Sequence, residues 1–280
     1  MFNRAEEPQN FPQISHKYRP PFRLGTTSFI YPAGWAENVA RLAPHLDEVE
    51  LLFFESQTLQ SLPDRAEMQQ LADLAARVGL SYTVHLPVDV DLCADDGAER
   101  RRAAAILKSI VADTAGLPVT SYTLHLPCPV YTSGSMAQVD RWRAYARRGL
   151  EALLTAGVDP NVLSIETLHY PFEWAFPLVE ALDLRVCLDM GHLIIYGYDL
   201  AEALDRYLPL TTVIHLHGVA EDRDHLPLDR MDAGLLDGIL ERLRKQGYCG
   251  SLSLEVFGLA ALERSLTCFK NAWEKIVKTP

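Results

Sequence analysis

Short runs rich in β-branched, aromatic and leucine residues alternate with longer segments along most of the chain. The longer segments, such as 64–78 and 99–115, place apolar residues at the spacing of an amphipathic helix. The short runs are typical of buried strands and occupy residues 22–29, 48–55, 81–87, 121–127, 162–168, 185–189, 211–218 and 251–257. Eight strand–helix repeats predict a (β/α)8 barrel, the TIM-barrel form of the α/β class.

A doubly wound parallel sheet would also alternate strands and helices, but it usually has fewer strands and often a glycine-rich first turn. Here the first turn reads GTTSFIYPAG and has no GxGxxG motif. No linker-like stretch interrupts the pattern, so we expect one barrel domain over residues 21–280. Residues 1–20 are polar, contain prolines and lack the apolar region of a signal peptide, so we expect them to form a flexible tail.

Composition indicates which cellular environment and which partners this barrel can have. The length of 280 residues fits one barrel domain, and no apolar stretch is long enough to span a bilayer. The five cysteines are scattered and form no CxxC pair, which favours reduced thiols in a cytoplasmic protein. A net charge of −11 disfavours nucleic acid as a partner. We therefore expect a small-molecule substrate and neither nucleic acid nor membrane as a partner; the oligomeric state stays open.

Histidines and carboxylates gather where the predicted strands end, which is where a (β/α)8 barrel carries its reactive groups. Six of the nine histidines lie at these ends or just beyond. The full set is His85, His125, His192, His215, His217 and His225, with the carboxylates Glu166, Asp189 and Glu255. A lone strand-end histidine is more often a hydrogen-bonded scaffold residue than a ligand, so the prediction depends on the whole set.

The combination of imidazole and carboxylate is typical of sites for zinc, manganese or iron. Glu166 and Glu255 lie in otherwise apolar strands, where an unpaired carboxylate is costly, and no lysine or arginine stands among the strand-end candidates. The sequence therefore predicts a catalytic site for divalent metal ions, with zinc or manganese favoured and room for more than one ion.

Three further features leave alternatives open. Glu50 and Glu55, five residues apart on one predicted strand, fall on opposite faces, and either could support the site or contact substrate. Glu55 could equally be exposed on the surface. His169 could approach the site or simply belong to an aromatic loop. In the loop DRDH, Asp222, Asp224 or neither of them could take part in the site.

The set and its order resemble the xylose isomerase-like barrels, a superfamily of sugar isomerases, epimerases and AP endonucleases. The motifs are His125, Glu166 in SIETL, Asp189-x-x-His192 in LDMGH, His215 in VIHLHG and Glu255 in LSLEVF. The resemblance implies that Glu166, Asp189, His215 and Glu255 form the central metal site. It also implies that His85, His125 and His192 hold additional metals, as in the three-metal endonucleases, and that His225 is the late-loop histidine.

This sequence departs from the endonuclease pattern in that late loop. The endonucleases have Asp-x-His there, whereas this chain has Asp222-Arg223-Asp224-His225, so the sequence leaves the register of this loop and the number of metals open. His217 stands where the endonucleases have no clear ligand. It shares a strand face with His215, which makes it a candidate to bind a metal or a phosphate oxygen.

A narrower resemblance, to the cobamide-remodelling phosphodiesterases, is carried by the segment LGTTSFIYPAGWAENVARLAPHLDEVELLFFES and by VHLPVD and DRDHLPL. It implies hydrolysis of the nucleotide-loop phosphodiester of B12-type cofactors to a cobinamide and α-ribazole phosphate. Water activated by the ions would attack phosphorus, with Glu166 and Glu255 acting through the metals. His217 and the other rim histidines would contact the phosphate or protonate the leaving group.

Other functions remain open from the sequence. A sugar isomerase or epimerase could use one ion, with Glu166 and Glu255 as acid and base. The apolar, aromatic loops at 29–31, 170–174 and 194–196 favour a larger ligand than a free sugar. A DNA-repair nuclease fits the superfamily but not the acidic charge, and a cobamide-binding protein without turnover is a further alternative.

Overall fold

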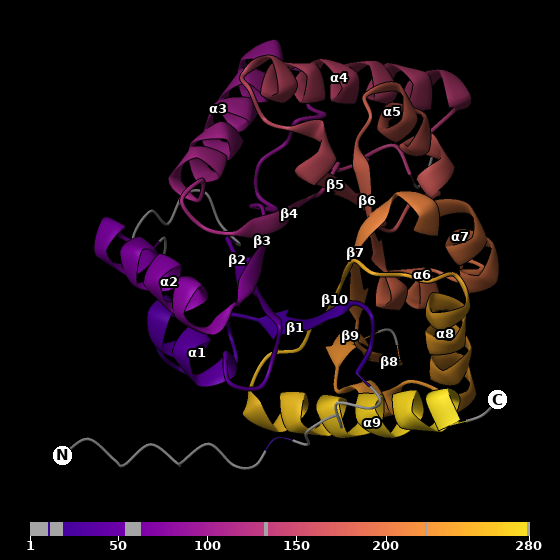
Figure 1. The fold of residues 1–280 in the computed structure, drawn as a ribbon. Coiled ribbons are helices and arrows are strands. Elements are labelled where there is room, and N and C mark those ends of the chain that lie inside the picture. The colour runs from indigo at the N-terminus through magenta and orange to yellow at the C-terminus, as the bar shows by residue number, and fades with distance from the viewer. Residues whose placement is uncertain (1–10, 12–18, 54–62, 132–133, 222, 279–280) are drawn as a thin grey trace.

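Eight parallel strands close into a barrel in the computed structural model, which describes residues 11, 19–53, 63–131, 134–221 and 223–278. The strand order around the barrel is β1-β10-β7-β6-β5-β4-β3-β2 (Figure 1). The bounds are β1 (Arg23–Thr27), β2 (Glu48–Leu52), β3 (Ser81–His85), β4 (Val119–Leu124), β5 (Leu163–Glu166), β6 (Arg185–Asp189), β7 (Thr211–Leu216) and β10 (Ser251–Leu254). Each coincides with one of the eight predicted runs, so the predicted (β/α)8 fold is confirmed.

Helices surround the barrel (Figure 1). They are α1 (Trp35–Leu42), α2 (Arg65–Val78), α3 (Gly97–Asp113), α4 (Met136–Thr155), α5 (Phe176–Ala181), α6 (Met190–Ile195), α7 (Leu200–Tyr207), α8 (Ala233–Lys245) and α9 (Leu259–Lys278). Short 3-10 turns lie at η3 (Pro160–Val162), η4 (Phe172–Trp174), η5 (Leu208–Leu210) and η6 (Leu228–Arg230). Asp64 shows how the sequence starts such a helix, because its side chain accepts hydrogen bonds from the first backbone N–H groups of α2.

The two faces of the strands bury different chemistry. Outward residues such as Tyr82 and Tyr122 are buried under the helices, in an apolar layer that includes Phe269 and Trp273 of α9. The inner face instead carries hydroxyls, and the Ser164 hydroxyl lies 2.7 Å from that of Ser121 and 2.6 Å from that of Thr212. The barrel axis is therefore polar where TIM barrels commonly hold branched apolar side chains.

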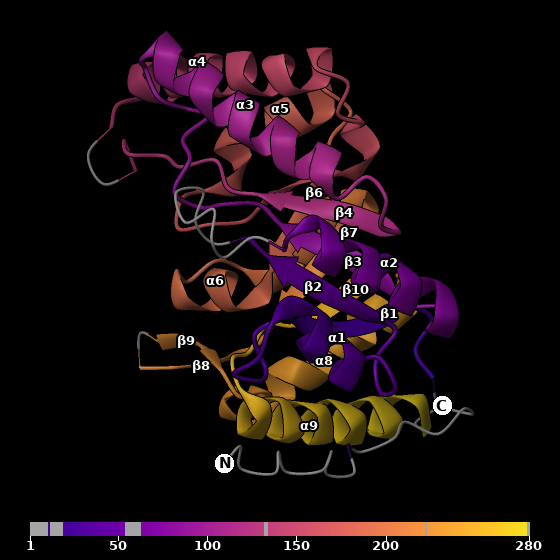
Figure 2. The same ribbon diagram turned by 90° about the vertical axis from the view of Figure 1, so that its left-hand side faces the viewer.

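A two-stranded antiparallel hairpin follows β7 and was not expected from the sequence. It consists of β8 (Gly218–Ala220) and β9 (Arg223–Leu226), and it lies beside α6 (Figure 2). Two of its residues have left-handed backbone, Glu221 with φ 54° and His225 with φ 51°. Such backbone is uncommon outside glycine, so the conformation at His225 points to a constraint from the site that it faces.

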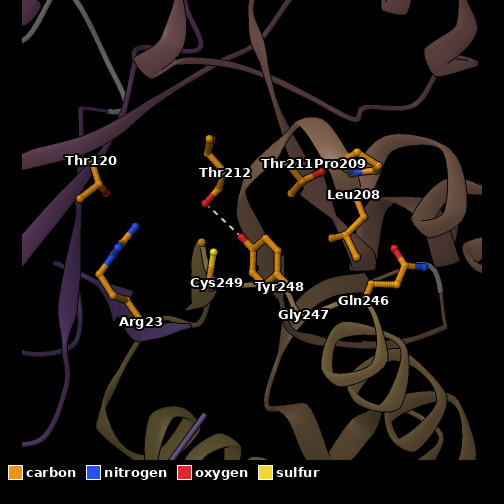
Figure 3. Close-up of a pocket in the computed structure, with 11 residues that line it drawn as sticks. Arg23, Thr120, Leu208, Pro209, Thr211, Thr212, Gln246, Gly247, Tyr248 and Cys249 are labelled. Carbon is orange, nitrogen blue, oxygen red and sulfur yellow. Dashed lines mark hydrogen bonds between the residues drawn. The ribbon is translucent and has the colours of Figure 1, made fainter. Parts of the chain in front are cut away.

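The opposite, N-terminal end of the barrel holds a pocket of about 460 Å³ (Figure 3). Arg23, Thr120, Thr212, Tyr248 and Cys249 are among its lining residues, which include no histidine or carboxylate. The Tyr248 hydroxyl donates to the Thr212 carbonyl at 3.0 Å. This pocket has none of the candidate metal ligands, all of which lie at the C-terminal end.

Two expectations concern the chain ends and membranes. Of the predicted tail, Phe11 is buried and its ring centroid lies 4.7 Å from that of His45. Residues 1–10 and 12–18 lie outside the described residues. The boundary at residue 20 therefore stays a prediction. Across the described part of the chain, no helix combines the length and apolar character needed to cross a membrane.

The apolar layer between helices and strands should carry much of the stability of the fold. Phe269→Ala, at a fully buried position, is expected to lower the free energy of unfolding by ~3–5 kcal/mol through lost burial and a cavity, as measured by urea denaturation. Val277→Ala, on the exposed side of the same helix, should change it by less than ~1 kcal/mol. Equal losses in the two variants would contradict this account.

Candidate metal centre

The Glu166 carboxylate is the centre of the strand-end cluster. It is buried at the end of β5, and its Oε2 lies 2.8 Å from His125 Nε2 and 3.1 Å from His85 Nε2. Its Oε1 lies 3.5 Å from Nδ1 of both His192 and His215. One carboxylate therefore faces four of the predicted histidines, which lie on β3, directly after β4, on α6 and on β7.

His215 is surrounded by carboxylates on both sides of its ring. Nδ1 lies 3.0 Å from Glu255 Oε2, 3.5 Å from Glu166 Oε1 and 3.7 Å from Asp189 Oδ2. On the other side, Nε2 lies 2.9 Å from Glu50 Oε1. These are the four residues that the resemblance placed in a central metal site, with Glu50 added behind them.

Several of these buried atoms have no well-formed hydrogen bond. Among the described side chains, both ring nitrogens of His215, Glu255 Oε2 and Glu50 Oε1 are buried without a hydrogen-bond partner, although they lie at ion-pair distances. Buried polar groups are costly when unsatisfied. A divalent cation on the Nδ1 side would satisfy the imidazole and the carboxylates together, so the donor set fits a metal.

Glu50 supports this site from behind. Its Oε2 accepts a hydrogen bond from the Ser253 hydroxyl at 2.7 Å, which fixes the carboxylate opposite His215 Nε2. A carboxylate behind a metal-binding histidine orients the ring and raises its basicity. Of the alternatives left open for Glu50, the structure favours this supporting position. Glu55 lies outside the described residues.

The Asp-x-x-His motif is explained by helix capping. Asp189 ends β6 and is the N-cap of α6, where its Oδ1 accepts from the His192 backbone N–H at 2.7 Å. The same turn brings His192 Nδ1 to 3.4 Å from Asp189 Oδ2. The spacing of three residues therefore places both side chains on one site.

The β8–β9 hairpin brings its own groups to the rim. His225 Nε2 lies 3.4 Å from Glu255 Oε2, and its Nδ1 lies 3.0 Å from Asp224 Oδ1. Asp224 Oδ2 in turn lies 3.8 Å from His192 Nε2. Asp224 is thus close enough to join the site, whereas Asp222 lies outside the described residues.

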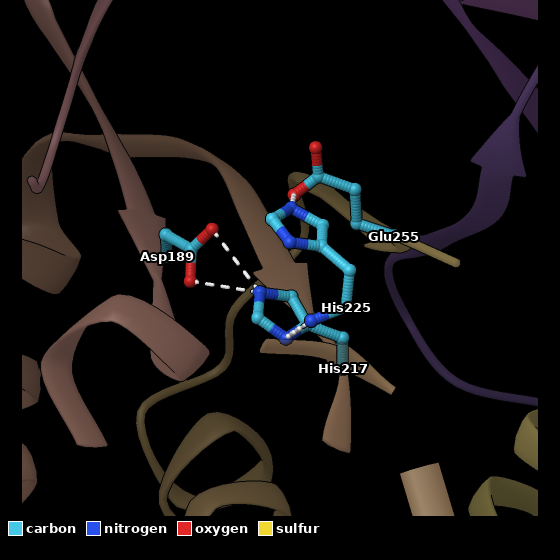
Figure 4. A group of neighbouring side chains, drawn as sticks. All are labelled: Asp189, His217, His225 and Glu255. Atoms are coloured by element: carbon cyan, nitrogen blue, oxygen red, sulfur yellow. Dashed lines mark hydrogen bonds and ion pairs between the residues drawn. The ribbon is translucent and has the colours of Figure 1, made fainter. Parts of the chain in front are cut away.

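The described residues contain four groups of potential metal ligands, and within each group the ligand atoms all lie within 4.8 Å of one another. They are Asp189/His217/His225/Glu255 (Figure 4), His85/His125/Glu166, Glu166/Cys187/His215 and Glu166/Asp189/His192. Every predicted site residue belongs to one of them. Cys187 was not expected there, and its burial raises the pKa of the thiol well above the usual range, which disfavours a thiolate ligand.

His169 lies at the edge of this cluster and in none of the four groups. Its ring contacts those of Tyr131 and Tyr196, with centroids 5.1 and 6.0 Å away. The structure therefore favours its alternative place in an aromatic loop.

Charge pairing shifts the titration of the cluster. Burial alone would raise the pKa of Glu166, but the surrounding histidines, His125 and His215 foremost, hold that pKa well below its ordinary value. Burial would lower the pKa of His85, yet its hydrogen bond to Glu166 and the nearby carboxylates raise it to about 9. Burial would likewise lower the pKa of His225, but Glu255 and Asp224 help to raise it to about 10. The raised pKa values of His85 and His225 favour their protonated forms, whose positive charge offsets the carboxylates when no metal is bound.

A family model described as the xylose isomerase-like TIM barrel matches residues 38–272. The chain belongs to this family. Among curated proteins, none matches the chain at a significant level. The predicted superfamily is thus confirmed, while the narrower resemblance to cobamide phosphodiesterases stays a prediction.

Solved structures share the fold. A D-tagatose 3-epimerase-like protein is 16% identical with a TM-score of 0.74, covering 92% of this chain and 99% of its own. Endonuclease IV from Thermus thermophilus is 25% identical with a TM-score of 0.67, covering 90% of this chain and 99% of its own. The IOLI protein with a bound zinc atom is 12% identical with a TM-score of 0.68, covering 91% of this chain and 98% of its own.

Loss of Glu166 should affect metal binding more than loss of any one histidine, because Glu166 belongs to three of the four ligand groups. We expect Glu166→Ala to weaken metal affinity beyond the ~10–100-fold typical of losing an outer-shell partner. Metal analysis after dialysis, with circular dichroism as a folding control, measures this. His85→Ala, which removes one ligand from one group, should retain more metal; full metal content in Glu166→Ala would remove it from the site.

The metal-free protein should lose stability as the pH rises from about 6.5 to 10. The folded-state pKa values of His85 and His225 are raised to about 9 and about 10, so their contribution is complete below about pH 6.5 and is lost as pH rises through those values. The carboxylates stay ionised throughout this range. Thermal midpoints in EDTA should therefore fall, and bound metal should flatten the fall, since metal replaces the protons. A midpoint that rises over this range would contradict the assignment.

Proposed function

We propose that this protein is a metal-dependent phosphodiesterase that hydrolyses the nucleotide-loop phosphodiester of cobamides to a cobinamide and α-ribazole phosphate. The observation that carries the hydrolase class is the number of ligand groups that converge on Glu166 and Asp189. They offer places for more than one divalent ion, and closely spaced ions suit phosphodiester hydrolysis. The cobamide substrate rests on the resemblance of segments 24–56, 84–89 and 222–228.

The mouth of the site suits a ligand larger than a sugar. Phe29, Tyr131, Tyr196 and Phe257 are exposed, and each follows the C-terminal end of a strand. The ring centroids of Phe257 and His225 are 5.5 Å apart. Exposed aromatic side chains around a polar centre provide apolar surface for a corrin or benzimidazole ring while the phosphodiester reaches the ligands below.

The reaction adds water across one phosphoester bond. The water oxygen bonds to phosphorus, the bond to the oxygen of the corrinoid's arm breaks, and that oxygen takes up a proton. Bound divalent ions would neutralise the phosphoryl oxygens, lower the pKa of the attacking water to ~7 and stabilise the leaving oxygen. Glu166, Asp189, His215 and Glu255 would hold them. The partly exposed His225 would contact the phosphate or donate the proton from its ring.

Turnover of a cobamide in the presence of divalent metal is the direct test. Purified protein with zinc, manganese or another divalent ion should release cobinamide and ribazole phosphate, measured by absorbance and mass spectrometry. Glu166→Ala should reduce turnover to background, and Glu151→Ala, an exposed carboxylate on α4, should not change it. No product with any metal from folded, metal-loaded protein would refute the substrate.

A sugar epimerase is the second candidate. Glu166 and Glu255 both face Nδ1 of His215, a placement that would suit an acid–base pair on either side of one metal-bound sugar. Interconversion of ketoses without cobamide cleavage would decide for it. Cleavage of a duplex with an abasic site would instead indicate a nuclease, against the net charge of −11.

A further inference from the structure

His217 occupies an ambiguous place in the cluster. It follows β7, is fully buried, and its Nε2 lies 3.2 and 3.3 Å from the two oxygens of Asp189 (Figure 4). By distance alone it groups with Asp189, His225 and Glu255 as a possible metal ligand. Its burial beneath the His225 ring also keeps it from a phosphate at the mouth.

The hydrogen bonds of the ring decide which nitrogen carries the proton. The backbone N–H of His225 donates to His217 Nδ1 at 2.9 Å, so Nδ1 must offer its lone pair. In the neutral imidazole the proton then resides on Nε2, which points at Asp189. The carbonyl of Gly218 lies farther from Nδ1, at 3.4 Å, and competes poorly for the opposite tautomer. With its proton on Nε2, the ring has no lone pair to give a cation on the Asp189 side.

We propose that His217 is a positioning residue that joins the β8–β9 hairpin to the metal-binding carboxylate, and that it is not itself a metal ligand. Its Nε2–H donates to Asp189, and its Nδ1 accepts from the backbone of His225. The proposal rests on the metal site alone and does not depend on the cobamide substrate.

The surroundings of the ring are shaped for this bridge. The imidazoles of His217 and His225 stack with centroids 4.4 Å apart and planes inclined by 11°. In addition, α6 passes so close that a Cβ at Gly191 would overlap the His217 ring. The left-handed φ of 51° at His225 occurs at the residue whose N–H makes the bridge. The left-handed backbone at His225 and the absence of a side chain at Gly191 thus both allow the His217 ring to occupy this position.

The bridge gives the hairpin a route to the metal. Asp189 is held from two directions, by the His192 backbone N–H at its Oδ1 and by His217. A hydrogen-bond donor to a ligating carboxylate fixes its orientation and tunes its basicity. If the hairpin moved, the hydrogen bond from the His225 backbone N–H to His217 Nδ1 would break. His217 would then no longer be held with its proton on Nε2, and Asp189 would lose this constraint.

Two substitutions of His217 test whether its ring donates a hydrogen bond to Asp189 or binds a metal ion. His217→Gln can still donate an N–H to Asp189, whereas His217→Ala cannot. Isothermal titration with zinc should show His217→Ala weakened by ~10–100-fold with the same number of bound ions, and His217→Gln weakened less. Loss of one bound ion from both variants would overturn the proposal.

The tautomer itself can be observed. In zinc-loaded protein with ¹⁵N-histidine, with signals assigned through the His217→Gln variant, long-range ¹H–¹⁵N correlations should show His217 protonated at Nε2 and unprotonated at Nδ1. An unprotonated, metal-shifted Nε2 would overturn the proposal, whatever the affinities show. Neither measurement uses a substrate, so failure here is distinguishable from failure of the proposed phosphodiesterase activity.

A third variant moves the ring without removing it. Gly191→Ala should displace His217 and reproduce the weakened zinc affinity of His217→Ala, because the added methyl group occupies the ring's position. Gly238→Ala in α8, where an added Cβ meets no atom within 4 Å, is the matched control and should bind zinc as the unsubstituted protein does. Unchanged affinity in Gly191→Ala would contradict the need for the bridge.

Discussion

The buried charge of Glu166 is the constraint around which the upper end of the barrel is organised. A carboxylate at the end of an otherwise apolar strand needs compensating positive charge or hydrogen-bond donors, and it receives them from four histidines on four different elements. Asp189 and Glu255 share one of these histidines, His215, with Glu166. Protons on the histidines can meet this demand without metal, and bound divalent cations would meet it as well, so protonation and metal binding are two ways of compensating the same buried negative charge.

The fold and most of the cluster could be predicted because both follow from local pattern. Short apolar runs mark strands buried on both faces, and a parallel barrel brings all their C-terminal ends together. Histidines and carboxylates at those ends must therefore meet. The Asp189-x-x-His192 spacing brings both side chains together because Asp189 caps the start of α6. Helix capping is a local interaction, so the sequence alone indicates it.

What escaped prediction depends on contacts between distant segments. Glu50 on β2 meets His215 on β7, strands that are not neighbours in the barrel, so no pairing rule connects them. The strands of the β8–β9 hairpin, GVA and RDHL, are only three and four residues long, too short to show the alternation that marks a strand. The place of His217 beneath His225 depends on that hairpin, which is why strand alternation alone left its role open.

The two faces of the barrel strands carry different tasks: the inner face is polar and leads to the ligand groups, and the outer face packs against the helices. The hydroxyl layer of Ser121, Ser164 and Thr212 lies inside the strands, while the apolar layer that includes Phe269 lies outside them. Side chains that point inward can therefore change with little effect on the packing of the helices. Such a division favours evolutionary divergence, because a lineage can exchange ligands and acquire a new substrate on the inner face while the outer layer preserves the folded chain.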